Sequence, residues 1–142
     1  MTTDAEMRVG LRLTYTREVS AADCAAMSAV SEDRAGLHVD ADYARRAGFP
    51  DAIAPGLIPL SVIAKLSGDL NLLLRRIELD LLQPAFAGDR LTATLTVTAW
   101  DAAKRRMAAD GRVENQQGTA VMTGKLVGYL PDPAWGTPNK DT

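Results

Sequence analysis

The sequence predicts an α+β domain in which a five-stranded antiparallel sheet wraps around one central buried helix. Residues 57–66 are apolar almost all round, directly after the Pro55-Gly56 dipeptide, and a helix of this kind is normally buried. Four other segments alternate apolar and polar residues, which is typical of half-buried strands, and a fifth at residues 120–130 is long and strand-like. One of them precedes the apolar helix and four follow it, so a single helix is left for the sheet to cover.

The first strand is expected at residues 8–16, because Val9, Leu11, Leu13 and Tyr15 alternate with polar residues. Ser20 and Asp23 then form a capping-box-like start for an Ala-rich helix that runs to about Val30. Cys24 lies in this helix and is the single cysteine, so no intrachain disulfide can form. A small buried side chain is favoured there over a nucleophile.

Residues 31–39 are polar and are expected to be irregular. A second short helix should begin at Asp40, whose carboxylate can cap free N–H groups, and should end near Gly48. The central helix is expected from Leu57 to about Gly68, and a helix that is apolar all round should be buried on every face.

Four consecutive strands are expected after the central helix, at residues 76–81, 91–99, 107–113 and 120–130. The connections between them are short, which implies antiparallel neighbours. Nothing in this stretch suggests a linker. Residues 1–131 are therefore predicted to form a single domain, and the Pro-rich residues 132–142 a loose C-terminal tail.

Composition excludes several classes of function. The 142 residues suit one domain, with 46% hydrophobic and 24% charged residues, as in ordinary globular proteins. The net charge of −2 offers no basic surplus for nucleic acid or an anionic membrane. The first residues lack the pattern of a signal peptide, and no apolar run reaches the ~18 residues of a membrane span. A cytoplasmic location is expected.

His38 is the single histidine and the side chain best suited to proton transfer near neutral pH. Asp33 lies five residues upstream in the same irregular segment. A loop can turn a carboxylate and an imidazole toward one point, where they can activate a water molecule and return a proton to carbon. The alternative is a surface histidine beside a turn aspartate.

The start of the central helix is the second candidate element. The free N–H groups near Gly56 and Leu57 point outward at the positive end of the helix dipole, and can stabilise negative charge on a carbonyl oxygen. Ser61, one turn further on, either bonds back to the backbone carbonyl four residues earlier or touches a ligand. One histidine and one cysteine do not make a metal site, so no metal and no cofactor are expected.

These residues resemble the MaoC-like family, which includes R-specific enoyl-CoA hydratases and has the hot-dog fold. The family pattern is roughly Asp-x-Asn-Pro-x-His-x-Asp, then Gly-Phe, then Ile-x-His-Gly-Met with a serine in the following helix. The resemblance covers residues 8–131. The matching positions are Asp33, His38, Asp40, Gly48-Phe49, Ile53, Gly56, Leu57 and Ser61, followed by Gln83-Pro84 and Phe86–Asp89.

The resemblance implies a hydratase or dehydratase that adds or removes water at a 2-enoyl or 3-hydroxyacyl thioester, bound to CoA or to an acyl carrier protein. Asp33 and His38 match the catalytic pair, the Gly56 N–H matches the contact to the thioester carbonyl, with Leu57 beside it, and Ser61 matches a serine near the active site. A homodimer joined edge to edge is also implied.

Three positions depart from the family pattern. Its Asn is Ala35, its Pro is Gly36, and the His of its His-Gly is Pro55. These changes favour an unusual acyl chain, as in secondary, polyketide or fatty acid metabolism. The alternatives are a hot-dog thioesterase, a conjugate-addition or cyclisation enzyme, and a non-catalytic subunit that binds acyl thioesters.

Overall fold

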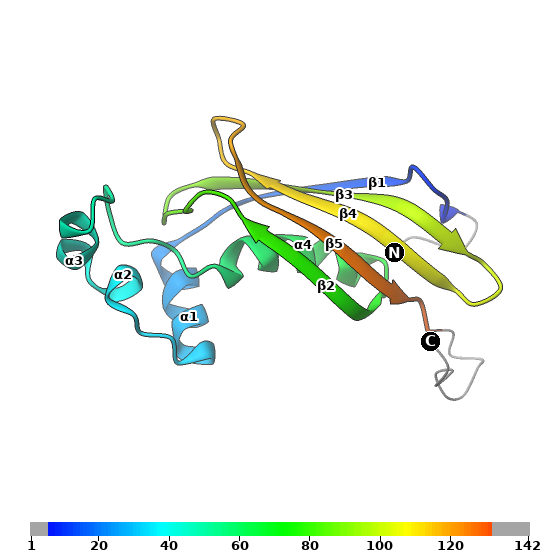
Figure 1. Cartoon of the computed structure of the whole chain (residues 1–142), viewed down its shortest axis with the longest axis horizontal. Coiled ribbons are helices and arrows are strands. Elements are labelled where there is room, and N and C mark those ends of the chain that lie inside the picture. The colour runs from blue at the N-terminus through cyan, green and yellow to red at the C-terminus, as the bar shows by residue number, and fades with distance from the viewer. Residues whose placement is uncertain (1–5, 132–142) are drawn as a thin grey trace.

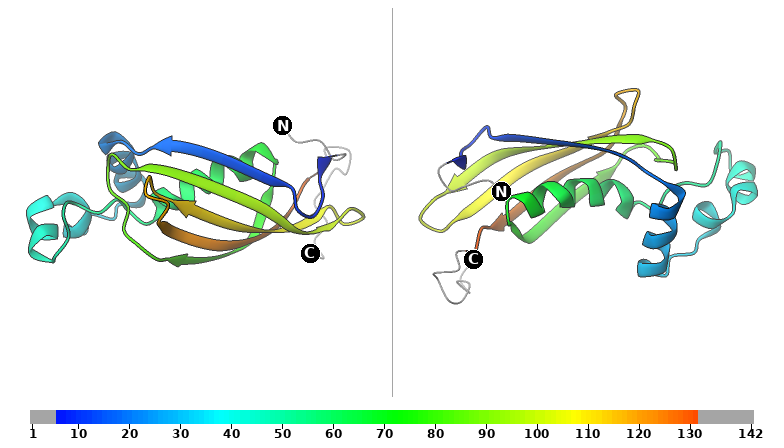
Figure 2. Two further views of the ribbon diagram at one scale, coloured as in Figure 1. Left: turned by 90° about the horizontal axis from the view of Figure 1, so that it is seen from above. Right: turned by 180° about the vertical axis from the view of Figure 1, so that it is seen from behind.

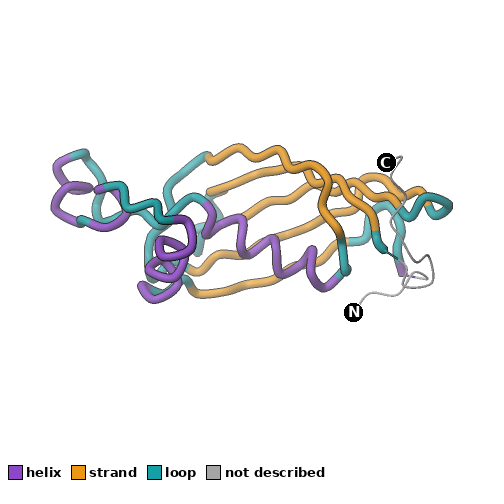
Figure 3. The backbone as a smooth tube through the Cα atoms, turned by 90° about the horizontal axis from the view of Figure 1, so that it is seen from below, coloured by secondary structure: helices purple, strands orange, loops and turns teal. Residues whose placement is uncertain are grey.

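The computed structural model describes residues 6–131, and the predicted tail at 132–142 lies outside them. Helix α4 (Leu57–Asp69) runs along one face of a five-stranded antiparallel sheet (Figure 3), which confirms the predicted α+β fold. Three shorter helices gather at one end of the sheet (Figure 1): α1 (Ala21–Ser31), α2 (Gly36–Val39) and α3 (Ala41–Arg46).

The strand order is β1-β3-β4-β5-β2. The strands are β1 (Arg12–Glu18), β2 (Leu73–Leu81), β3 (Arg90–Asp101), β4 (Arg106–Glu114) and β5 (Ala120–Tyr129). The expectation that consecutive strands are neighbours holds for β3–β4 and β4–β5, but is wrong for β2, which pairs with β5. Because β3 pairs with β1 and β4, it has no free side for β2, which becomes an edge strand.

The core lies between α4 and the concave face of the sheet. Alternate residues of β3 and β4 are buried there against the helix, as their period of two predicts. Burial of one such side chain stabilises the fold by about 1.5–3 kcal/mol. The central contacts come from Ile58, Val62, Ile63 and Leu66 on the helix and Leu91, Leu95, Val97, Met107 and Val113 on the sheet.

The prediction that the central helix is buried on every face is wrong. The sheet covers only one side of α4, as the view from behind in Figure 2 shows. Leu57 is 48% exposed, and Ala64 and Lys65 are exposed on the uncovered side. An apolar helix sequence therefore indicates a buried face without stating how far the covering layer extends.

Side chains cap the starts of α1 and α3 as predicted. Ser20 and Asp23 form a complete capping box at α1, and the hydrogen bond from the Ser20 backbone N–H is the main reason that the pKa of Asp23 is lowered. The Asp40 carboxylate accepts from the backbone N–H groups of Asp42 and Tyr43, at 3.0 and 3.1 Å, and so caps α3.

Two boundaries differ from the sequence analysis. Residues 36–39, expected to be irregular, form the single turn α2, which Ile53 holds by donating its N–H to the Leu37 carbonyl at 2.7 Å. The first strand begins at Arg12 instead of residue 8, because Gly10 adopts a φ of +89° in a turn. No helix within residues 6–131 is long and apolar enough to cross a membrane.

Candidate active site

His38 lies on α2 and is held in one orientation by the backbone. Its Nδ1 lies 2.8 Å from the carbonyl oxygen of Ile53. A carbonyl only accepts hydrogen bonds, so Nδ1 carries the proton and donates it. The other ring nitrogen, Nε2, is then an acceptor when the ring is neutral. The His38 side chain is only 16% exposed, so the ring presents Nε2 from a sheltered position.

Asp33 lies opposite that nitrogen, with 3.5 Å between its Oδ2 and His38 Nε2. Its other oxygen, Oδ1, accepts the backbone N–H of Ala35 at 3.1 Å, and its own backbone N–H donates to the Ser31 hydroxyl. These bonds fix the carboxylate while its side chain stays 52% exposed. The structure therefore brings together the two residues that the sequence singled out for proton transfer, each with an accepting atom turned toward the other.

The loop that carries His38 is ordered by contacts other than those expected from the family pattern. His38 donates its backbone N–H to the Ala35 carbonyl at 2.8 Å. At Gly36 an added Cβ would lie 2.9 Å from Cγ of Tyr43, so the aromatic ring packs where any side chain would stand. The Tyr43 ring and the Ile53 backbone therefore hold this loop in place of the Asn and Pro of the family pattern. Ala35 and Gly36 do not leave the loop unsupported.

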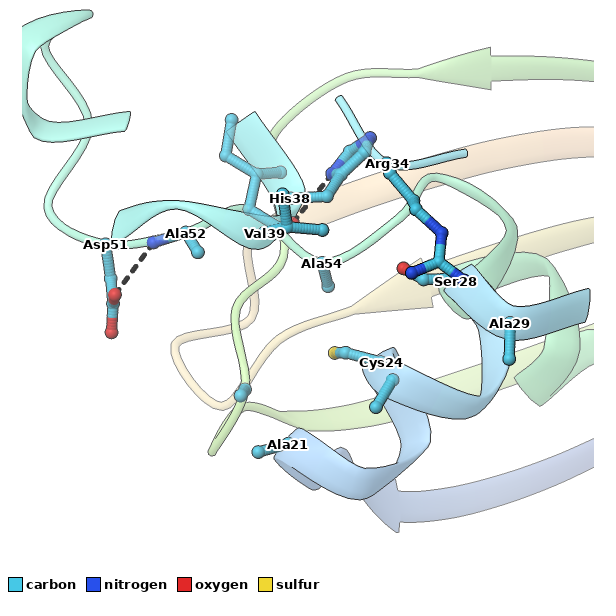
Figure 4. Close-up of a pocket in the computed structure, with 13 residues that line it drawn as sticks. Ala21, Cys24, Ser28, Ala29, Arg34, His38, Val39, Asp51, Ala52 and Ala54 are labelled. Carbon is cyan, nitrogen blue, oxygen red and sulfur yellow. Dashed lines mark hydrogen bonds between the residues drawn. The ribbon is translucent and has the colours of Figure 1, made fainter. Parts of the chain in front are cut away.

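Two hollows meet at His38. The larger, of about 550 Å³, lies between α1 and α2 and is named here the α1-side hollow (Figure 4). The smaller, of about 340 Å³, lies between the start of α4 and β2 and is named the β2-side hollow. His38, Ile53 and Ala54 line both, so the imidazole stands at the junction of two spaces.

Gly56 lines the β2-side hollow together with His38. A Cβ at Gly56 would come within 2.9 Å of Cδ1 of Leu81, so glycine keeps this wall open. Gly56 is the N-cap of α4 and has no side-chain cap. The N–H groups of Gly56 and Leu57 donate to no loop carbonyl within residues 6–131. Their contact with an oxyanion stays a prediction, and the Leu57 side chain does not line the hollow.

Ser61 does not share a hollow with His38. Its hydroxyl donates to the Ile58 carbonyl at 2.6 Å, three residues earlier. A bond back to the backbone was one of the two expectations, but the predicted acceptor was the carbonyl four residues earlier. It lines a separate hollow of about 270 Å³ between α4 and the opposite side of α1. The role of Ser61 near a substrate stays a prediction.

Some functional positions were not evident in the sequence. The Ile53 carbonyl that orients His38 belongs to the backbone, so the residue type at position 53 does not reveal this role. Arg34, next to Asp33, lines the α1-side hollow, and its place between Asp33 and His38 was the only available signal. Cys24 is half-buried on the same wall instead of fully buried, and burial raises the pKa of its thiol. Within residues 6–131 no three His, Cys, Asp or Glu side chains are grouped to hold a metal ion.

Comparison with known proteins places these features in a family. The family described as "MaoC like domain" matches residues 4–120. The (R)-specific enoyl-CoA hydratase of Aeromonas caviae is 31% identical over 130 residues, covering 88% of this chain and 96% of the relative.

Solved structures agree with the sequence comparison. The structure of the A. caviae (R)-hydratase involved in PHA biosynthesis superposes with a TM-score of 0.82 at 30% identity, covering 88% of this chain and 98% of the other. An unliganded R-hydratase from Pseudomonas aeruginosa gives the same TM-score and identity, covering 90% of this chain and 84% of that one. This chain belongs to the MaoC-like domain family and has its hot-dog fold.

Proposed function

We propose that this chain is a hydratase/dehydratase that adds water to a 2-enoyl thioester, or removes it from a 3-hydroxyacyl thioester. The observation that carries the proposal is the pair of facing acceptors, His38 Nε2 and Asp33 Oδ2, at 3.5 Å. That separation is too long for a direct hydrogen bond, but one water molecule can donate a hydrogen to each atom. The likeness to proteins named R-specific enoyl-CoA hydratases supports the same chemistry.

The mechanism assigns one task to the β2-side hollow and another to the His38–Asp33 pair. The thioester carbonyl accepts the Gly56 N–H in the β2-side hollow, where the helix dipole stabilises the enolate-like transition state. The held water loses one proton to the pair as its oxygen bonds to the β-carbon. The pair delivers a proton to the α-carbon, so its own protonation is restored after each turnover. Dehydration follows the same steps in reverse.

The test is incubation of the purified chain with crotonyl-CoA and with a longer 2-enoyl-CoA, following the enoyl absorbance and the product mass. The expected result is loss of the absorbance and gain of one water. The relatives named R-specific lead us to expect a (3R)-hydroxyacyl product, which chiral chromatography would identify. Release of free thiol without hydration would instead indicate a thioesterase. Binding without turnover would indicate a non-catalytic subunit.

A homodimer joined through β2 is the second part of the proposal. β2 ends the sheet order, so one side of its backbone has no strand partner within residues 6–131. Its Leu73, Ile77 and Leu81 are 44%, 41% and 62% exposed, although β2 also carries four charged residues of the kind that can protect an unpaired edge strand. Pairing of two β2 strands about a twofold axis would cover these side chains. Light scattering should give twice the mass of one chain.

A further inference from the structure

The β2-side hollow contains a polar side chain that the proposed mechanism does not use. Of the described residues that line this hollow, only His38 and Gln83 carry a polar side chain. Both ring nitrogens of His38 are already engaged, since Nδ1 donates to the Ile53 carbonyl and Nε2 faces Asp33. The carboxamide of Gln83 is therefore the side-chain donor that remains for a ligand in this part of the described chain.

The Gln83 carboxamide is not used to hold the fold together. Within residues 6–131 its side chain forms no hydrogen bond. The carboxamide of Gln116, by contrast, is used at both ends, because Nε2 donates to Asp89 at 3.0 Å and Oε1 accepts the Arg90 N–H at 3.1 Å. Gln83 is exposed, so its carboxamide can turn either N–H group toward whatever enters the hollow.

A backbone hydrogen bond ties the segment that carries Gln83 to the segment that leads into α4. Ala54 donates its N–H to the Ala85 carbonyl at 2.8 Å. Gly56 lies two residues after the donor of this bond, and Gln83 lies two residues before the acceptor. Two residues of chain span at most about 7 Å, so both positions are close to the same hydrogen bond. Gly56 and Gln83 are thus held beside one hollow, which both of them line.

The Gly56 N–H alone leaves the oxygen of the thioester carbonyl with a second lone pair to satisfy. The proposed function, on which this inference rests, places that oxygen at Gly56 and gives it one donor. A carbonyl oxygen can accept two hydrogen bonds, and its need for them grows as the enolate-like charge develops. The remaining side chains around this hollow are apolar and offer no donor, so an oxygen without a second partner would be poorly stabilised there.

We propose that the Gln83 carboxamide is the second hydrogen-bond donor to the thioester carbonyl oxygen, together with the Gly56 N–H. Its Nε2–H group donates most strongly in the transition state, when the enolate-like charge has formed. Gln83 neither takes nor gives a proton, which stays the task of His38 and Asp33. The contact involves only the carbonyl oxygen, so it is the same whichever hollow receives the acyl chain.

The first test measures hydration of crotonyl-CoA by Gln83→Leu, which removes the donor and keeps a side chain of similar size. The kcat should fall about 10- to 100-fold, as loss of a hydrogen bond to a charged oxygen gives, with little change in KM. Gln83→Glu keeps the shape but brings a negative charge toward the oxygen, so its kcat should fall further. Gln117→Leu, at an exposed position between β4 and β5, is the control and should keep the wild-type kcat.

Two inert ligands test whether the contact is made to the carbonyl. Butanoyl-CoA and S-butyl-CoA differ only in the carbonyl oxygen, and neither has a double bond to hydrate. The wild-type preference for butanoyl-CoA should fall about 5-fold in Gln83→Leu, as loss of one neutral hydrogen bond gives. The infrared stretching frequency of the carbonyl in bound, carbon-13-labelled butanoyl-CoA should rise in the variant, because a hydrogen-bond donor weakens the C=O bond.

The results that contradict this role of Gln83 are distinct from those that contradict the proposed function. An unchanged kcat and an unchanged carbonyl frequency in Gln83→Leu with a wild-type melting temperature would overturn the inference. An equal loss of affinity for both inert ligands would also overturn it, because the carboxamide would then contact another part of the substrate. Failure of the wild type to hydrate crotonyl-CoA would overturn the proposed function instead, and the inert ligands would still test the contact.

Discussion

The two hollows that meet at His38 have walls of different kinds. The β2-side hollow is formed by the backbone at the start of α4 and by an edge strand, and its chemical group is a main-chain N–H. The α1-side hollow is formed by side chains of α1 and by Arg34. A backbone donor is supplied by any sequence that builds the helix, but a side-chain wall changes with each substitution. The first hollow therefore suits the reaction common to the family, and the second can vary from one member of the family to another.

The largest expected effect is at the junction of the two hollows. Asp33→Asn keeps the Oδ1 that accepts the Ala35 N–H but removes the charged oxygen that faces His38. Turnover of crotonyl-CoA should fall by about 10²–10⁴-fold with an unchanged melting temperature. Near-wild-type turnover in a folded variant would remove Asp33 from the mechanism.

A substitution at Gly56 should block the β2-side hollow and leave the α1-side hollow open. Gly56→Leu places a side chain against Leu81, where even a Cβ would lie 2.9 Å from Cδ1, and keeps the carbonyl away from the N–H. The expected fall in kcat/KM is on the order of 10²-fold, like the loss of one oxyanion donor. Gly68→Leu on the same helix is the control, because a Cβ there meets nothing within 4 Å. Equal activities of the two variants would argue against a carbonyl at Gly56.

A substitution in the edge strand β2 should have a smaller effect, on the proposed dimer. Ile77→Arg puts a charge on the exposed edge of β2 and should halve the mass measured by light scattering, because a buried unpaired charge opposes strand pairing. Thr14→Arg, at an exposed position on the opposite edge strand, should leave the mass unchanged. A chain that is monomeric without any substitution would contradict the proposed dimer.

The smallest effect concerns Cys24 on the α1-side wall. Because burial raises its pKa, little thiolate is present at pH values near the ordinary thiol pKa of about 8.5. Alkylation by iodoacetamide should be slower there than for a free thiol, and should keep rising with pH above that range. Alkylation as fast as that of a free thiol would show that Cys24 is not sheltered.

Several parts of this protein could be predicted from local sequence. The alternation in β3 and β4, the Ser20–Asp23 capping box, the Asp40 cap and the start of α4 at Leu57 depend on residues close to one another in the chain. Local propensity and hydrogen-bonding capacity determine such features. Asp33, His38 and Gly56 were identified for the same reason, since each carries its chemistry in its residue type.

Other features depend on contacts between distant segments, and only the tertiary structure decided them. The sequence did not indicate that β2 pairs with β5, that α4 is covered on one side, or that the Ile53 carbonyl sets the proton on His38. Nor did it bring Arg34 to the wall formed by α1. Local patterns record which residues prefer burial or a hydrogen bond, but the partner is set by the packing of the whole chain. The sequence by itself thus determined the elements and the reacting groups, and the fold decided which surfaces those groups face.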